Sequence, residues 1–283
     1  MEVTKLCSGR EKGSVMMAVT KLEDIPTWDV AGIEVAAASS PSAQPDSELN
    51  GKISLWSGDM TKLEIDAIVN AANGSLLGGG GIDGAIHRAA GPNLRKECAG
   101  LQGCDTGDAK MTSGHDLPAR HIVHTVGPIG ENPEALASCY RRCLEVGVAE
   151  GGLRTLCYCC VSTGIYGYPP ARAARVALAT VRAWLEEAGN RGKVDRVVFC
   201  TFLPNDRAIY KKLLPEFFPL ANGEEKENSE NEQEEGEAHS SKQESEEDNE
   251  EQDDNEEMND DKEVTSSPGR HEGLDRNEEE KTS

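Results

Sequence analysis

The sequence predicts an α/β fold in which helices cover both faces of a sheet. Segments of helical periodicity alternate with β-rich runs, and several of these runs are continuously apolar, as in buried parallel strands. Charge is unevenly spread, because residues 221–283 hold 26 acidic and six basic residues while the whole chain has a net charge of −22. Residues 1–220 are therefore nearly neutral. We expect a globular domain followed by an acidic tail.

The predicted strands are short runs rich in β-branched or apolar residues, and turn residues bound several of them. In chain order they cover residues 52–58, 66–72, 110–113, 121–126, 155–161 and 195–202. The predicted helices repeat apolar residues at helical spacing. They cover residues 81–90, 133–150, 171–188 and 206–214, and Gly91-Pro92 interrupts the first of them before residues 93–101.

The chain divides into an N-terminal extension and linker (1–48), a domain (49–220) and the acidic tail (221–283). The tail has too little apolar content to offset the entropy of ordering, so we expect it to be disordered. Three roles are open for the tail. It keeps the domain soluble, it docks on basic partners, or it is a substrate for modification. No apolar run is long enough to span a membrane, and we expect no membrane association.

Nine cysteines and no recognisable signal peptide indicate a reducing compartment. Cys157 to Cys160 contain a C-x-x-C pattern, but no second pair follows at zinc-finger spacing. The pattern lies within a predicted strand, so we favour structural burial over metal or redox chemistry. His121 and His124 are likewise expected to be strand residues, and with His115 they form no recognisable metal spacing.

Four consecutive glycines, residues 78–81, lie between a predicted strand and a predicted helix. Backbone N–H groups converge at such a turn and the helix dipole adds positive potential, so a diphosphate is a natural ligand. No P-loop pattern is present. Gly79, Gly81 and Gly84 satisfy G-x-G-x-x-G, but no strand ending in an acid follows at the required distance, which argues against a dinucleotide-dependent dehydrogenase.

Three separated stretches carry a resemblance to a known family. They are GDMTKLEIDAIVNAANGSLLGGGGIDGAIHRAAG (58–91), GDAKMTSGHDLPARHIVHTVGP (107–128) and STGIYGYP (162–169). Together they resemble a macrodomain of the MacroD type, an ADP-ribosyl hydrolase, over residues 49–218. The long acidic tail resembles that of one of the two vertebrate MacroD paralogues. The resemblance implies a three-layer α/β/α fold with a mixed six-stranded sheet and an ADP-ribose cleft at the strand ends.

The resemblance also implies which residues bind the nucleotide. Asp59 accepts a hydrogen bond from the adenine amino group beside the main chain of Met60, unless it is only a turn or cap residue. Phe202 packs on the adenine ring, unless it is buried in the core. The diphosphate lies between two loops, and Tyr166 stacks on the distal ribose. The loop residues are Gly79, Gly80, Gly81 and Ile82 in one loop, and Ser162, Thr163, Gly164, Ile165 and Tyr166 in the other.

Catalysis is expected at the distal ribose. Asn73 hydrogen-bonds the ribose hydroxyls, and Asn70 supports the loop geometry. Asp83 orients water or ribose, or only caps the helix. His87 lies one helical turn beyond Asp83, where it pairs with that carboxylate or is simply buried. An aspartate of ordinary pKa is a weak base, so the bound phosphate is a second candidate for activating water.

The leading interpretation is a hydrolase that removes mono-ADP-ribose from Asp and Glu side chains and deacetylates O-acetyl-ADP-ribose. No nucleophile motif is present, so water attack without a covalent intermediate is favoured, with no metal or redox cofactor. The alternative is a non-catalytic ADP-ribose reader. The expected partners are mono-ADP-ribosylated proteins and, for the tail, basic surfaces. Charge argues against general nucleic-acid binding. The resemblance implies a cytoplasmic and nuclear location and a role in the DNA damage response.

Overall fold

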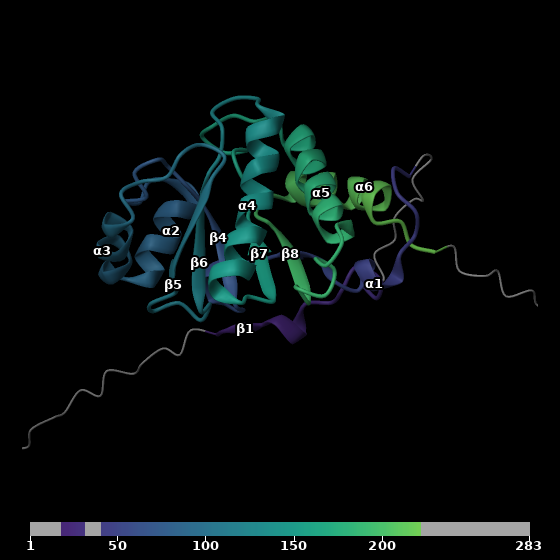
Figure 1. Cartoon of the computed structure of the whole chain (residues 1–283), viewed down its shortest axis with the longest axis horizontal. Helices are drawn as coiled ribbons and strands as arrows, with labels where there is room; N and C mark the ends of the chain where they lie inside the picture. Colours follow the sequence, from purple (N-terminus) through teal and green to yellow (C-terminus); the bar gives the residue numbers. More distant parts are fainter. Residues whose placement is uncertain (1–17, 32–40, 222–283) are drawn as a thin grey trace, which may run out of the picture. The chain divides into compact units, whose positions relative to one another are not determined.

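The computed structural model describes residues 18–31 and 41–221, and a six-stranded sheet lies at its centre (Figure 1). Five strands are mutually parallel, and β5 runs antiparallel to β6 at one edge. The strand order is β2 (Ile53–Ser57), β8 (Arg196–Thr201), β7 (Thr155–Tyr158), β4 (Ala67–Ala72), β6 (His121–Val126) and β5 (Ala109–Ser113). The mixed sheet is confirmed. A separate parallel pair joins β1 (Thr20–Lys21) to β3 (Leu63–Glu64).

The helices begin where the sequence places good initiators. Proline occupies the first turn of four of them, where its missing N–H costs nothing, and Asn132 caps α4 by accepting from the Ala135 amide at 3.0 Å. The helices are α1 (Ser47–Asn50), α2 (Gly81–Ala90), α3 (Pro92–Gly100), α4 (Pro133–Gly151), α5 (Pro170–Glu186) and α6 (Pro204–Phe217), with short 3₁₀ turns η1 (Leu22–Asp24) and η2 (Met60–Lys62). Within the described ranges, no helix has the length and apolar character needed to cross a bilayer.

Neighbouring residues of β6 show that the helices form two layers. The His124 ring contacts Cys98 of α3, whereas Thr125, the next residue, lies beside Cys139 of α4, whose thiol donates to the Val126 carbonyl at 3.3 Å. Successive side chains of a strand point to opposite faces, so α3 and α4 lie on opposite sides of the sheet. Helix α2 packs beside α3, while α4, α5 and α6 pack in succession (Figure 1). The three-layer arrangement implied by the resemblance is confirmed.

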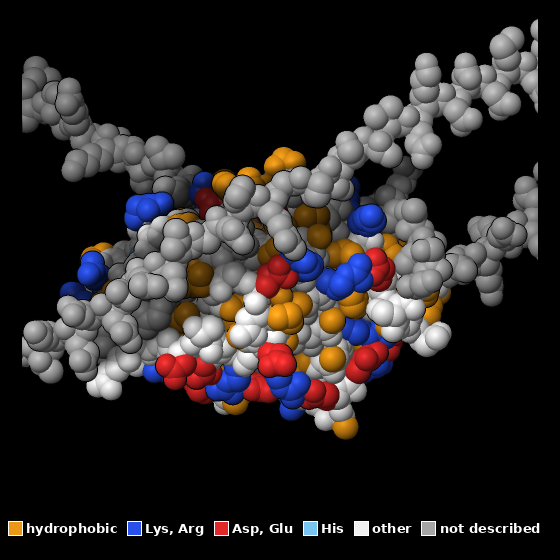
Figure 2. Space-filling model, turned by 90° about the horizontal axis from the view of Figure 1, so that it is seen from above, with side chains coloured by type: hydrophobic (Ala, Val, Ile, Leu, Met, Phe, Trp, Pro, Cys, Tyr) orange, Lys and Arg blue, Asp and Glu red, His pale blue; other side chains and the backbone are white. Residues whose placement is uncertain are grey.

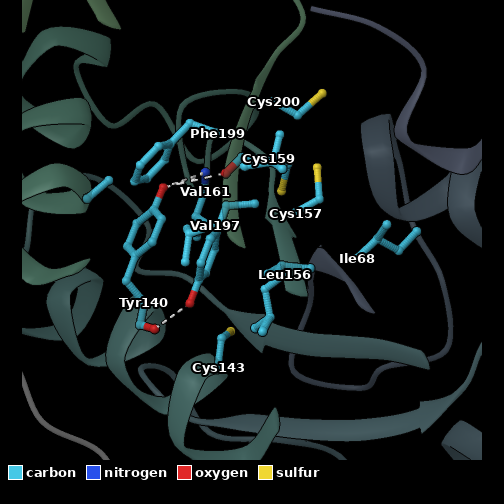
Figure 3. Packing of buried hydrophobic residues seen from close by; sticks show 14 of the residues in the cluster. Ile68, Tyr140, Cys143, Leu156, Cys157, Cys159, Val161, Val197, Phe199 and Cys200 are labelled. Carbon is cyan, nitrogen blue, oxygen red and sulfur yellow. Dashed lines mark hydrogen bonds between the residues drawn. The ribbon is translucent and has the colours of Figure 1, made fainter. Parts of the chain in front are cut away.

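Aromatic and cysteine side chains fill the core between the sheet and α4 (Figure 3). The Tyr158 hydroxyl donates to the Tyr140 carbonyl at 2.7 Å, and the Tyr158 ring stacks against Phe199 with centroids 6.3 Å apart. Cys157 and Cys159 are also buried, and burial raises the pKa of the Cys159 thiol to about 12. A protonated thiol is a poor nucleophile and metal ligand. The structure thus favours the structural role predicted for this C-x-x-C pattern.

The predicted extension contributes to the domain. Ile25 and Trp28 are 2% exposed and belong to the same core, and the Trp28 indole donates to the Phe218 carbonyl at 2.7 Å. The packed unit therefore extends beyond the predicted start at residue 49. Residues 1–17 and 32–40 of the predicted extension and linker, and the predicted disordered tail from residue 222 onwards, lie outside the described residues.

We expect Trp28→Ala to lower the free energy of unfolding by about 3 kcal/mol, because it leaves a large cavity and an unpaired carbonyl at Phe218. Urea denaturation of the full chain measures this change. Val30→Ala is the matched control, since Val30 is 70% exposed and its truncation should change the free energy by under about 0.5 kcal/mol. Equal effects of the two variants would contradict the packing of this segment.

The surface of the domain agrees with its near-neutral charge. Figure 2 shows Lys and Arg side chains interspersed with Asp and Glu on the face that it presents, rather than gathered into a field of one sign. Many of these charges are paired, as Arg141 is with Glu145 at 2.8 Å and Arg191 with Glu48 at 3.0 Å. Such pairing leaves few arginines free to bind a ligand.

Candidate active site

The Gly-rich loop connects the end of β4 to the start of α2. Gly78 and Gly81 have φ values of 88° and 59°, a region that favours glycine. Gly80 is the N-cap of α2, and no side chain caps the helix. Asp83 is the third residue of α2 and accepts no capping hydrogen bond, so the alternative that it caps the helix is wrong. The first amides of α2 are left available, as they are where helices bind anions.

The second predicted loop faces the first. A side-chain carbon added at Gly80 would lie 3.2 Å from Cδ1 of Ile165, so the two loops approach closely. The backbone amides of residues 79–82 and 163–166 donate no hydrogen bond to any of the described residues. Two rows of unpaired backbone donors on facing loops are the arrangement expected of the predicted anion site.

The side chains of the second loop have varied surroundings. Ser162 is buried with φ of 64°, and its hydroxyl has no partner among the described residues. Thr163 donates to the Cys160 carbonyl at 3.0 Å, which fixes the loop. Ile165 is 86% exposed and Tyr166 is half-buried. The Tyr166 carbonyl accepts from the Gly130 amide at 2.7 Å, so its ring is held at the edge of the loop rather than packed in the core.

A buried carboxylate lies directly behind the Gly-rich loop. Asp83 is 3% exposed, and its Oδ1 accepts from Asn70 Nδ2 at 2.8 Å and lies 3.4 Å from His87 Nε2. Its Oδ2 is buried without a hydrogen-bond partner among the described residues. Burial raises the pKa of Asp83 and outweighs the lowering effects of Asn70 and His87. The site therefore holds one aspartate oxygen fixed and one free, with greater basicity than an exposed aspartate has.

Asn70 orients this carboxylate from β4. It is fully buried, and its Nδ2 also lies 3.0 Å from Nδ1 of His124, the residue opposite it on β6. Burial lowers the pKa of His124 to about 3, so the ring is neutral. We assign its proton to Nε2, 3.0 Å from Thr112 Oγ1, because Nδ1 must accept from Asn70. Asn70 thus supports the acid, whereas the sequence predicted that it supports the loop.

Asn73 lies on the other side of the loop from this network. Its Nδ2 donates to the Gly78 carbonyl at 3.0 Å, and its Oδ1 accepts from the Ser75 hydroxyl at 2.6 Å. A carbon added at Gly79 would lie 3.0 Å from both Asn73 Nδ2 and Asp83 Oδ2. These two atoms border one space beside Gly79, so the structure brings the predicted ribose ligand and the predicted acid together. Ile82, which follows the glycines, is half-buried against the core.

The predicted adenine end has one exposed ring and one capping acid. Phe202 is 89% exposed, so the alternative that it is buried in the core is wrong. Asp59 caps η2 by accepting from the Thr61 amide at 3.1 Å, yet its side chain is 51% exposed and retains acceptor capacity. Partial burial raises its pKa, but hydrogen bonds from Thr61 and the charge of Lys62 lower it further, so it is ionised. The Met60 side chain is buried, and only its main chain can face a ligand.

The sequence did not predict three members of the hydrogen-bond network behind the acid, namely His124, Thr112 and Cys98. His124 could be found only from the strand register, which pairs it with Asn70. His87, Cys98 and His124 each offer a potential metal ligand atom within 4.8 Å of the others. However, burial raises the pKa of the Cys98 thiol to about 11, and His124 Nε2 is engaged with Thr112. This cluster is therefore better suited to hydrogen bonding than to metal binding.

Comparison with known proteins now identifies the family. The model of the Macro domain matches residues 69–177. The protein named ADP-ribose glycohydrolase MACROD1 from Rattus norvegicus is 51% identical over 208 residues, which are 71% of this chain and 80% of the rat protein. The chain belongs to the macrodomain family. The human protein named ADP-ribose glycohydrolase MACROD2 is 53% identical over 192 residues, which are 66% of this chain and 44% of that protein. The resemblance to the MacroD type is confirmed.

Solved macrodomains support the same assignment. The Trypanosoma brucei macrodomain in complex with ADP-ribose superposes with a TM-score of 0.60 at 44% identity, covering 68% of this chain and 75% of that one. The macro domain of ganglioside induced differentiation associated protein 2 gives a TM-score of 0.65 at 33% identity, covering 72% and 98%. The first of these binds the nucleotide that the loops of this macrodomain were predicted to bind.

Proposed function

We propose that this macrodomain is an ADP-ribosyl hydrolase that removes mono-ADP-ribose from Asp and Glu side chains of modified proteins and deacetylates O-acetyl-ADP-ribose. The observation that carries the proposal is the free, buried Oδ2 of Asp83 beside Asn73, next to two rows of unpaired amides. Relatives named ADP-ribose glycohydrolases and a macrodomain solved with ADP-ribose support it. The amides bind the diphosphate through hydrogen bonds and so position the attached ribose beside the acid.

The order of the groups along the cleft defines the pose. Adenine lies between Phe202 and Asp59, the diphosphate lies between the two loops, and the distal ribose lies beside Tyr166 and Asn73. Asn73 then exchanges a local hydrogen bond for one to a ribose hydroxyl. This pose brings the anomeric carbon to the space that Asp83 Oδ2 borders. Positioning of this kind supplies much of the rate enhancement in hydrolases.

A water held by Asp83 Oδ2 attacks the anomeric carbon in the proposed reaction. The bond from that carbon to the acceptor oxygen breaks, the acceptor leaves as a carboxylate, and the proton of water passes to Asp83 and then to solvent. The raised pKa of Asp83 makes it a better base than an ordinary aspartate, and Asn70 keeps it oriented. The substrate phosphate remains a second candidate for this proton transfer. His87, 3.4 Å from the carboxylate, stabilises its charge.

A reader module that binds without turnover is the competing function, because it would use the same amides. Turnover separates the two. With a glutamate-linked mono-ADP-ribosylated protein in hundredfold excess over this chain, we expect complete release of free ADP-ribose. Binding of ADP-ribose without release would establish the reader. The buried environment of Asp83 favours the hydrolase, because an acid with a raised pKa is costly to keep unless it acts.

Phe202→Ala tests the adenine platform. We expect it to weaken ADP-ribose binding roughly tenfold, because a base stacked on an aromatic ring gains about 1–3 kcal/mol. Stability should not change, since the Phe202 side chain is 89% exposed. Calorimetric titration with ADP-ribose measures the affinity, and the distant, exposed Val30→Ala is its control. Unchanged affinity would remove Phe202 from the site.

We also propose that the protein acts in the cytoplasm and the nucleus, in the response to DNA damage, and that residues 221–283 bind basic partners. The MacroD resemblance supports the first two, and the 26 acidic residues of the tail support the third. Imaging of the tagged full chain before and after DNA damage tests the location. Capture by full chain, but not by a chain ending at residue 220, tests the partners.

A further inference from the structure

An open pocket of about 310 Å³ lies along α2 and the start of α3, one side chain away from the acid. Its lining residues are Leu77, His87, Arg88, Gly91, Pro92 and Arg95. His87 joins it to the catalytic network, because His87 Nε2 lies 3.4 Å from Asp83 Oδ1. Leu77 joins it to the Gly-rich loop, since it precedes Gly78, whose added carbon would lie 3.3 Å from the His87 ring. The pocket therefore lies next to both the Gly-rich loop and the acid.

Two arginines in this pocket differ from the other arginines of the domain. Among the twelve arginines in the described ranges, ten form an ion pair or a side-chain hydrogen bond, whereas Arg88 and Arg95 form neither. Both are exposed. Asp116 approaches Gly91 nearby but pairs with neither arginine. Two unpaired guanidinium groups on one pocket can bind carboxylates or phosphates.

We propose that this pocket binds acidic side chains of the modified polypeptide, next to the ADP-ribosylated residue. The inference rests on the proposed function, which places the anomeric carbon beside Asp83. The acceptor side chain meets the anomeric carbon beside Asp83, so residues that flank it in the polypeptide lie within reach of this neighbouring pocket. Arg88 and Arg95 then pair with neighbouring Asp or Glu residues, while Leu77 and Pro92 contact the polypeptide. The pocket makes the hydrolase selective for modification sites in acidic segments.

Two matched substrates test this proposal. Both are synthetic peptides carrying ADP-ribose on one glutamate, and the flanking residues are Asp and Glu in one peptide and Ser and Ala in the other. We expect wild-type KM to be about tenfold lower for the acidic peptide, with little change in kcat, because exposed charges mainly affect encounter and binding. This preference should fade at about 0.5 M salt, where charges are screened within a few ångströms.

Arg88→Glu with Arg95→Glu should raise KM for the acidic peptide at least about tenfold. The same double variant should hydrolyse O-acetyl-ADP-ribose, which lacks a polypeptide, at a rate within about twofold of wild type. That second activity shows that the variant is folded and separates failure of this inference from failure of the proposed function. Lys96→Glu is the control, since it makes the charge change of each single arginine substitution on exposed α3 without lining the pocket.

Equal wild-type KM values for the two peptides would overturn the proposal. So would an equal loss caused by Lys96→Glu, which would point to net charge rather than to the pocket. The proposal would also be wrong if the double variant hydrolysed both peptides normally but was slow on a substrate with two linked ADP-ribose units. That result would mean that the arginines bind the phosphates of the second unit.

Discussion

Asp83→Asn should abolish release of ADP-ribose from a glutamate-linked substrate, lowering kcat at least about a thousandfold, while ADP-ribose still binds within about threefold of wild type. The amide keeps the shape of the carboxylate and can still accept from Asn70, but it cannot take a proton from water. Single-turnover release measures the first quantity, and calorimetric titration measures the second. The effect should fall on kcat, because the variant loses an interaction made in the transition state.

The same variant should be more stable than wild type at pH 7, by about 1 kcal/mol, because it removes a buried ionised group. The sign follows from the raised pKa of Asp83. A protonated Asp83 costs little to bury, and this advantage is lost as the pH rises through its pKa in the folded state. The gain from asparagine should therefore shrink as the pH falls toward 4. Turnover by Asp83→Asn at a wild-type rate, or a loss of stability at pH 7, would contradict this description of the site.

Asn70→Ala should have the second largest effect. It removes the donor to both Asp83 Oδ1 and His124 Nδ1, leaving two buried acceptors unpaired. We expect a loss of roughly 3 kcal/mol in the free energy of unfolding and a fall of roughly a hundredfold in kcat, since the acid loses its orientation. Urea denaturation and steady-state kinetics measure the two changes.

A control variant and a double-mutant cycle separate orientation from general destabilisation. Thr112→Val removes the partner of His124 at the far end of the network, so it should lower stability but leave kcat within about fivefold. In the Asp83→Asn background, Asn70→Ala should cause little further loss of activity. Independent, additive losses of activity would show that Asn70 does not act through Asp83.

Local signals account for most of the fold that the sequence predicted. Strand β8 contains the continuous apolar run Val197–Cys200, and α4 starts at Asn132-Pro133 and is followed by Gly152 in a left-handed conformation, so their limits are encoded in a few residues. The strand predicted at residues 155–161 ends early, at Tyr158, because the chain then turns into the phosphate loop. Trp28 was left outside the domain because nothing local reveals its contact with Phe218, 190 residues away.

The site was predictable where function depends on the main chain. Glycines that require positive φ leave a visible pattern, so the sequence located the turn where the structure has two facing loops with free amides. Side chains that act through packing across the sheet were not predictable. Asn70 was expected only to support the loop and His124 to be an ordinary strand residue, because both roles depend on the pairing of β4 with β6. Asp83 was expected to act at the ribose because of the family resemblance, and its position in α2 beside Asn70 is set by the fold. Burial, which raises the pKa of Asp83, also follows from that packing.

Hydrolysis in water enriched in ¹⁸O tests the central claim most directly. A peptide carrying ADP-ribose on one glutamate is incubated with a catalytic amount of the full chain, and the released peptide is weighed by mass spectrometry. Attack on the anomeric carbon beside Asp83 predicts many turnovers and a freed glutamate without the heavy isotope. Heavy oxygen in that glutamate, which would mean attack on the ester carbonyl, or the absence of any released peptide, would contradict the account.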